Sequence, residues 1–417
     1  MANVGVYGLG AAVTVSNFAT IEGSTTVVAS MGVDLAAGGA VSNGASGATA
    51  ALISGQQYGV IIDAGGSVGN YGTITAAFAF AARLASGGTV TNAGVMRGGS
   101  GVAMLAGRGI VTNSGTITGS SGAGVQLAAG GTIADSGTIA GSGTAVALGG
   151  TSDNLLILEH GYALQGAVAG SASASNTLEL LGSSSASAVT ANYNALSLSN
   201  FGTVAFAAEA SNYATLTIAN TAALPGTIAG FTGAHDRIDL TTLSDAGNDT
   251  TASLATLTNV LTVTGDNSSV ELQLDNENYS GLTFTTQNDG SGGVAITPHL
   301  LAQPAISSVI PDQGVPDETP IAPFATVTVT DPTPAAVDTV SVTLLDPTVG
   351  TLSNFGAGSF DTKTGTYTVS GSASAVTAAL DALVFTPTTP PRTYSSQQRG
   401  CHSAPQAQGA QSLSAHP

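Results

Sequence analysis

The stretch GIVTNSGTITGSSGAGVQLAAGGTIADSGTIAG, residues 109–141, contains nearly the same phrase twice: IVTNSGTI at 110–117 and TIADSGTI at 132–139. The phrase Val-x-Asn, or a close substitute, occurs at six places: Val15–Asn17, Val41–Asn43, Val68–Asn70, Val90–Asn92, Val111–Asn113 and Ile133–Asp135. Successive Asn or Asp residues are 26, 27, 22, 21 and 22 positions apart. Repeats of this length are typical of solenoid proteins, in which each repeat forms one coil.

A second series of apolar residues keeps the same step: Ile62, Leu84, Leu105, Leu127 and Leu148. Apolar residues alternate within a repeat, as in VQL (125–127), which is the period of a strand with one buried face. Glycine pairs such as GG (130–131) interrupt the strands where sharp corners are needed. We therefore predict an all-β fold that begins, over residues 1–205, with a right-handed parallel β-solenoid.

The repeat explains how such a chain folds. One coil cannot bury its own apolar face, but columns of Val, Ile and Leu stacked along the axis make a continuous core. We also expect the Asn column to form a ladder of side-chain amides at a corner, where asparagine tolerates the left-handed backbone.

Charged residues are few and are unevenly distributed along the chain. Only 8% of residues are charged and the net charge is −18. Residues 1–230 hold eight carboxylates and three arginines (−5), and residues 231–417 hold seventeen carboxylates and four basic residues (−13). This surface repels phosphate backbones, which argues against nucleic-acid binding and leaves metal cations as the more plausible small partners.

Cysteine content and hydropathy argue against a disulfide-rich fold and against a membrane-spanning segment. The single cysteine, Cys401, rules out an internal disulfide framework. No uncharged apolar run reaches the roughly 18 residues of a membrane span, so we expect no membrane-spanning segment in this chain. The first residues lack the basic segment followed by an apolar segment that is typical of an N-terminal signal peptide.

The repeats resemble the β-helical passenger regions of bacterial autotransporter-like and filamentous-haemagglutinin-like surface proteins. The likeness rests on VTNAG (90–94), VTNSGTI (111–117), IADSGTI (133–139), DNLLILEHGYALQGAV (153–168) and NTLELLG (176–182). The resemblance implies a β-helix located outside the cell or at the bacterial surface. It does not select an activity, because such scaffolds carry adhesins, cytolysins and proteases.

The rest of the chain divides by composition. We predict a β-rich end-of-solenoid segment at 206–300 and a linker at 301–324, which contains five prolines. Residues 325–391 alternate like a partial β-sandwich with one short helix at 373–383, and resemble the immunoglobulin- or cadherin-like modules of large secreted bacterial proteins. The abrupt change of composition predicts that residues 392–417 are disordered, as the end of a truncated or out-of-frame chain.

We predict no catalytic site, because each candidate group of residues has a better structural explanation. Ser67 stands in a Gly-x-Ser-x-Gly pattern, but Thr89 and Thr132 take the same repeat position, which favours a corner residue. Asp153, Glu159 and His160 form a polar cluster near the last regular coils. There, charges more often block end-to-end sheet pairing than act in catalysis.

Two acidic groups are candidates for a cation. His235, Asp236 and Asp239 could act together with Asp245 and Asp249, although a solvated acidic loop is the favoured alternative. We predict that the linker carboxylates bind calcium, because oxygen ligands suit this ion and the cadherin-like modules that the segment resembles take calcium at such junctions. These predicted calcium ligands are Asp312, Asp317, Glu318 and Asp331.

The sequence thus predicts a structural and adhesive segment of a large bacterial surface or secreted protein, with no enzymatic activity. Its expected partners are a host or neighbouring cell surface, a matrix protein or a glycan. One alternative is a polysaccharide-acting enzyme, for which the ladder offers only Asp34, Asp63 and Arg83. The other is a self-assembling surface-layer protein.

Overall fold

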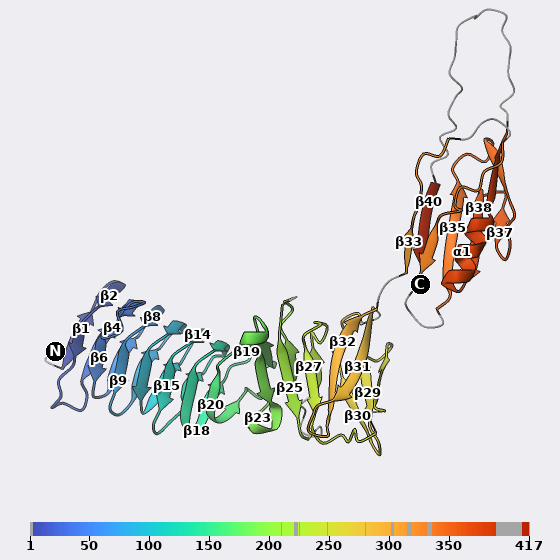
Figure 1. Cartoon of the computed structure of the whole chain (residues 1–417). Coiled ribbons are helices and arrows are strands. Elements are labelled where there is room, and N and C mark those ends of the chain that lie inside the picture. The colour runs from blue at the N-terminus through green and yellow to red at the C-terminus, as the bar shows by residue number, and fades with distance from the viewer. Residues whose placement is uncertain are drawn as a thin grey trace, which may run out of the picture. The chain divides into compact units, whose positions relative to one another are not determined.

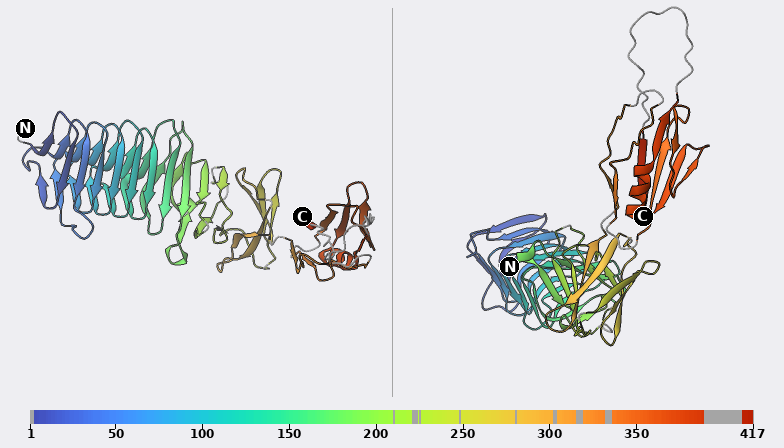
Figure 2. Two further views of the ribbon diagram at one scale, coloured as in Figure 1. Left: turned by 90° about the horizontal axis from the view of Figure 1, so that it is seen from above. Right: turned by 45° about the vertical axis from the view of Figure 1, so that its right-hand side comes forward.

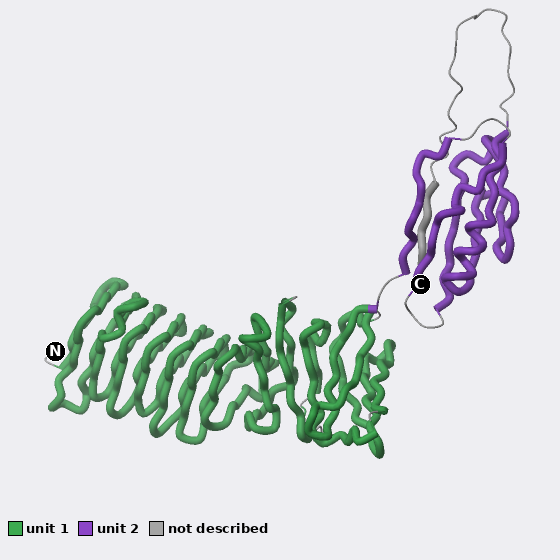
Figure 3. The backbone as a smooth tube through the Cα atoms, viewed as in Figure 1, with its two compact units in different colours: residues 1–300 green, residues 301–417 purple. Residues whose placement is uncertain are grey.

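The computed structural model describes residues 3–209, 211–220, 224, 226–247, 249–279, 281–301, 304–314, 319–331, 336–388 and, for the backbone, 411–416. The chain divides into two compact units, residues 1–300 and 301–417 (Figure 3). Each unit has its own hydrophobic core. We describe the units separately.

The first unit is a parallel β-solenoid whose coils stack along one axis (Figures 1 and 2). Each regular coil contributes three short strands, and each strand pairs in parallel with its equivalents in the neighbouring coils. The predicted all-β solenoid is therefore confirmed.

The coil strands form three stacks. The first stack contains β1 (Val4–Gly8), β4 (Met31–Leu35), β7 (Tyr58–Ile62), β10 (Phe80–Leu84), β13 (Ser100–Met104) and β16 (Val125–Leu127). The second contains β2 (Val13–Asn17), β5 (Gly39–Asn43), β8 (Gly66–Asn70), β11 (Gly88–Asn92), β14 (Gly109–Asn113), β17 (Gly131–Asp135), β19 (Asn154–Glu159), β21 (Asn176–Leu181), β24 (Thr203–Phe206) and β26 (Thr227–Ala229). The third contains β3 (Thr20–Glu22), β6 (Leu52–Gly55), β9 (Thr73–Ala76), β12 (Val95–Gly98) and β15 (Thr116–Gly119). The longer strands β18 (Thr138–Leu148) and β20 (Ala163–Ala169) run from the third stack into the first, which ends at β23 (Leu198–Ser199).

The core is built from residues that repeat in register. The second stack alone provides ten of them: Val15, Val41, Val68, Val90, Val111, Ile133, Leu156, Leu178, Val204 and Ile228. All are buried. Burying one such side chain is worth roughly 1.5–3 kcal/mol, whereas ordering one residue of backbone costs about 1–2 kcal/mol. A coil of more than twenty residues is therefore stable only when stacked.

One member of the second predicted series is wrong. The buried position between Leu84 and Leu127 belongs to Met104, not to Leu105. Leu105 is 39% exposed because it follows the end of β13, at the turn. The true steps in this column are therefore less even than the sequence suggested, since the loop between coils absorbs the difference.

The Asn column forms the predicted amide ladder, but not in the predicted backbone. Side chains of Asn17, Asn43, Asn70, Asn92, Asn113 and Asp135 join one another by hydrogen bonds of 2.7–2.9 Å. These residues point into the solenoid, are at most 5% exposed, and none has a positive φ. The expectation of a left-handed backbone was wrong, because each amide faces inward from the end of a strand to reach the next coil.

Glycines take the left-handed corners instead. Gly130 and Gly131 have φ angles of 78° and 150°. A Cβ atom at Gly131 would overlap with the carbonyl oxygen of Gly109 in the preceding coil. This corner therefore needs glycine both for its dihedral angle and for the close approach of two backbones.

Parallel stacking continues beyond the predicted boundary at residue 205. The third stack resumes as β22 (Val189–Asn192), β25 (Ala214–Ile218) and β27 (Arg237–Leu240). The coils persist although the Val-x-Asn phrase is gone, because alternating burial is retained. Two short 3₁₀ helices, η1 (Ser185–Ser187) and η2 (Tyr193–Ala195), lie in the connections.

The stack ends in antiparallel structure. Strand β32 (Val294–Leu300) pairs antiparallel with β27 and with β31 (Leu282–Asn288). A separate three-stranded sheet consists of β28 (Thr251–Ala255), β29 (Val260–Thr264) and β30 (Ser269–Gln273). Apolar residues of this sheet join the solenoid core. The antiparallel strands thus cover the last parallel edge, which would otherwise be open to pairing with another chain.

The second unit is a smaller β-rich module. Its strands are β33 (Ala305–Ser307), β34 (Thr328–Thr330), β35 (Asp338–Leu344), β36 (Gly350–Ser353), β37 (Ser359–Asp361), β38 (Thr366–Gly371), β39 (Val384–Pro387) and β40 (Gln411–His416). Its helix α1 (Ala373–Ala382) confirms the predicted short helix and is capped by the Ser372 hydroxyl, which accepts from the Ala375 amide at 3.3 Å.

Most of the tail predicted to be disordered, residues 392–417, lies outside the described residues. Within it the structure places strand β40, paired antiparallel with β35. Across the described part of the chain, no helix has the length and apolarity needed to cross a membrane.

Candidate functional site

The serine of the Gly-x-Ser-x-Gly pattern is a surface residue of the solenoid. Ser67 lies within β8 and is exposed, in register with Ala40 and Thr89. It is thus a strand residue rather than the corner residue we expected. Its neighbours in the column are an alanine and a threonine, which offer no base to activate a nucleophile.

Asp153, Glu159 and His160 do not form one cluster, because Asp153 precedes β19 whereas Glu159 ends that strand and His160 follows it. The backbone carbonyl of Asp153 accepts from Arg108 at 2.6 Å, and Nδ1 of His160 lies 2.9 Å from the carbonyl of Ala188. The first contact joins loops that are two coils apart, and the second joins neighbouring coils. Both contacts favour a structural role for these residues.

The scattered charges of the regular coils include one surface ion pair. Arg83 contacts Asp63 at 3.0 Å, with both side chains partly exposed. Burial, with a smaller effect from Asp63, raises the pKa of Asp34 above its usual value. An exposed pair of this kind contributes about 0–1 kcal/mol.

Two buried carboxylates each accept a hydrogen bond from an asparagine side chain. Asp135 accepts from Asn113 at 2.7 Å, and Asp236 accepts from Asn212 at 2.8 Å. Both are at most 1% exposed. Burial raises the pKa of Asp135 to about 6 and that of Asp236 to about 7. Asp236 is therefore part of the solenoid interior rather than of a surface cation site.

The other residues grouped with Asp236 in the sequence are also separated. His235 stacks on the ring of Tyr213, with centroids 4.0 Å apart. Asp239 lies near Arg237 and Asp289, and burial is the main cause of its raised pKa. The predicted five-residue cation group is therefore not assembled as one site.

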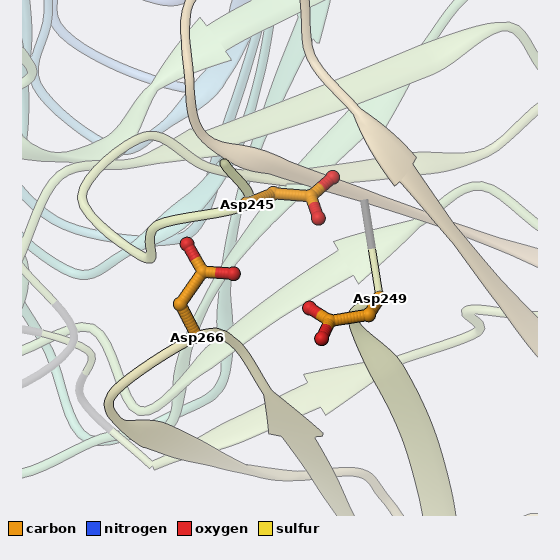
Figure 4. A group of neighbouring side chains, drawn as sticks. All are labelled: Asp245, Asp249 and Asp266. Carbon is orange, nitrogen blue, oxygen red and sulfur yellow. The ribbon is translucent and has the colours of Figure 1, made fainter. Parts of the chain in front are cut away.

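Asp245 and Asp249 do come together, and their partner is Asp266 (Figure 4). One carboxylate oxygen from each residue lies within 4.8 Å of the other two. Among the described residues, this is the one group of three or more His, Cys, Asp or Glu side chains placed closely enough to share an ion. Sequence reasoning missed Asp266 because it lies in the β29–β30 turn and no motif spacing links it to Asp249.

The predicted linker calcium site is only partly described. Asp317 and Glu318 lie outside the described residues. Asp312 is exposed and has a φ of 53°, and Asp331 interacts with Asp338, whose pKa is raised first by burial and then by Asp331. The calcium assignment to these four residues remains a prediction.

Comparisons with protein-family models, with curated proteins and with solved structures found no significant match to this chain.

Proposed function

We propose that this chain is a structural and adhesive segment of a bacterial cell-surface or secreted protein. In this role the solenoid is a stiff spacer, and one of its outer faces binds a neutral glycan on a cell or in a matrix. The proposal includes no enzymatic activity.

The observation that carries the proposal is the composition of the outer face of the second stack. Its outward residues stack in register from coil to coil. One column is Thr14, Ala40, Ser67, Thr89, Ile110 and Thr132, and the next is Ser16, Ser42, Gly69, Thr91, Thr112 and Ala134. Over these six coils hydroxyl groups predominate in both columns and neither column contains a charge. The second column reaches its first charge two coils further on, at Glu179.

Such a face suits an uncharged repeating polymer. Neighbouring coils are about 4.8 Å apart, so the hydroxyl groups recur at a regular step. Each hydroxyl can both donate and accept a hydrogen bond, as can the hydroxyls of a sugar. Thr91 and Thr112 are exposed and adjacent, which makes them the natural centre of the face.

The test is binding of the full chain to an array of neutral oligosaccharides. Replacing Thr91 and Thr112 together by Glu places two like charges side by side on the face, and we expect it to abolish binding. The matched control replaces Thr116 and Thr138, which are paired neighbours on the third stack, by Glu. The control should bind as the parent does.

Binding that survives the first pair of substitutions would overturn the assignment of this face. So would a parent chain that binds no neutral glycan. Shortening of a bound polysaccharide during incubation would contradict the non-enzymatic role.

A further inference from the structure

Three carboxylates from separate parts of the chain meet near the end of the first unit (Figure 4). Asp245 belongs to the connection after β27, Asp249 lies two residues before β28, and Asp266 lies in the turn between β29 and β30. The turn at Gly247 brings two of them close. A Cβ atom on Gly247 would lie 2.9 Å from Oδ1 of Asp249 and 3.3 Å from Oδ1 of Asp266.

Asp245 is the informative member of this cluster. Its side chain is 2% exposed, and neither carboxylate oxygen has a hydrogen-bond partner in the described part of the chain. An ionised carboxylate buried without a partner is strongly unfavourable unless an opposite charge compensates it. One of its carboxylate oxygens lies within 4.8 Å of an oxygen of each of the other two acids.

Asp266 is held in place by the loop that carries the other two acids. Its Oδ2 accepts from the Ser244 hydroxyl at 2.7 Å and from the Ala246 amide at 2.8 Å, and its Oδ1 accepts from the Gly247 amide at 3.2 Å. Oδ1, which accepts only one of these hydrogen bonds, retains a lone pair for a further partner.

Basic side chains are scarce around this cluster. Between Arg237 and Lys363 the chain contains no lysine or arginine. Among the described residues, none of the three acids forms an ion pair with a lysine or arginine, which leaves a proton or a cation from solution to compensate their charge.

We propose that Asp245, Asp249 and Asp266 form a binding site for one calcium ion. All donors are hard oxygen atoms, which calcium prefers. Oxygens that coordinate one calcium ion at about 2.3–2.6 Å are at most roughly 5 Å apart, and the three oxygens here satisfy that limit. Asp249 is exposed, which leaves a side for entry and for water ligands.

The ion would strengthen a junction that hydrogen bonds already make, since the Asp266 amide donates to the Ser244 carbonyl at 3.1 Å. The 245–249 connection follows the last parallel strand of the third stack, and Asp266 belongs to the antiparallel sheet β28–β30. Calcium would fasten this sheet to the end of the solenoid. At a hundredfold excess over Kd, calcium should lower the unfolding equilibrium constant of this region about 100-fold.

The experiment is isothermal titration of the full chain with calcium chloride after treatment with a chelator. The test variant is Asp249→Asn, whose exposed side chain can change without disturbing the core. The matched control is Glu271→Gln, an exposed acid on β30 in the same segment. We expect a Kd on the order of 10⁻⁴–10⁻³ M for this site, at least tenfold weaker binding in the test variant, and parental binding in the control.

Hydrogen exchange locates the ion. Calcium should slow exchange across residues 241–275 in the parent and in Glu271→Gln but not in Asp249→Asn. The variant Asp245→Asn should raise the melting temperature of the calcium-free chain and remove its calcium-dependent increase.

Four results would overturn the site. These are an absence of heat in the parent, equal affinity and stoichiometry in Asp249→Asn, calcium protection confined to residues outside 241–275, and tighter binding of magnesium than of calcium.

Discussion

Asp135 ends the amide ladder of the solenoid, and replacing it by Asn should stabilise the protein in a pH-dependent way. Its Oδ1 accepts from Asn113 and from the Gly137 amide, whereas its Oδ2 is buried without a partner in the described part of the chain. The ladder stops here because Leu158 takes the equivalent position in the next coil. An Asn side chain has the same shape and keeps Oδ1 as an acceptor. Its amide nitrogen can donate to the carbonyl two residues later, as Asn113 does to Gly115 at 3.3 Å.

The magnitude follows from the shift of the pKa. Burial raises the pKa of Asp135 from 3.8 to about 6. A raised carboxyl pKa means that the folded state disfavours the charge, so the parent loses stability as the pH rises from about 4 to about 6. One pKa unit corresponds to about 1.36 kcal/mol, which gives about 3 kcal/mol as an upper value above pH 6. An Asn cannot ionise and does not incur this loss.

The assay is urea unfolding of the full chain followed by far-ultraviolet circular dichroism at pH 4 and pH 8. Asp135→Asn should exceed the parent by about 2–3 kcal/mol at pH 8 and by much less at pH 4. Equal stabilities of the parent and Asp135→Asn at pH 8 would refute the conclusion that the ionised Asp135 side chain destabilises the fold. So would a difference that is the same at both pH values.

Three further predictions follow from the packing and from the linker. Leu127→Asp should lower the melting temperature of the first unit sharply, because a buried unpaired charge costs several kcal/mol; an unchanged melt would show that this column is not the core. Gly131→Ala should cost about 1–3 kcal/mol in urea unfolding through strain and overlap, whereas Gly69→Ala, in open space, should cost much less. Calcium should protect residues 304–323 from proteolysis even in an Asp249→Asn background, and identical digestion with chelator would exclude a linker site.

Most of the fold could be predicted from the sequence because the core residues recur in a sequence repeat. Val90 and Val111 align in the structure as they do in the sequence, and so do their asparagines. The sequence could not show that Met104 rather than Leu105 is buried, because that choice depends on where the loop before β13 ends. Nor could it show that the coils continue to β27, where side-chain identity changes but alternating burial does not.

The candidate site was harder to predict. The sequence drew attention to Asp245 and Asp249 but joined them to His235, Asp236 and Asp239, which are near in the chain. In the fold, Asp236 turns into the interior, and Asp266 arrives from a hairpin formed by later strands. Proximity across a hairpin depends on strand pairing, which a single sequence without a repeat in this segment does not encode visibly.

The central claim is that residues about one repeat apart lie directly side by side, and disulfide formation measures this most directly. In a Cys401→Ser background, Thr91→Cys with Thr112→Cys should cross-link readily, because paired residues of adjacent coils are about 4.8 Å apart. Thr91→Cys with Thr118→Cys should not, because Thr118 belongs to β15 in another stack. Arg97 and Arg108 separate the cysteines in both pairs, so the same linked tryptic peptides report both. A cross-link in the first pair alone is the predicted result, and no cross-link there, or equal cross-linking in both pairs, would contradict the stacked register.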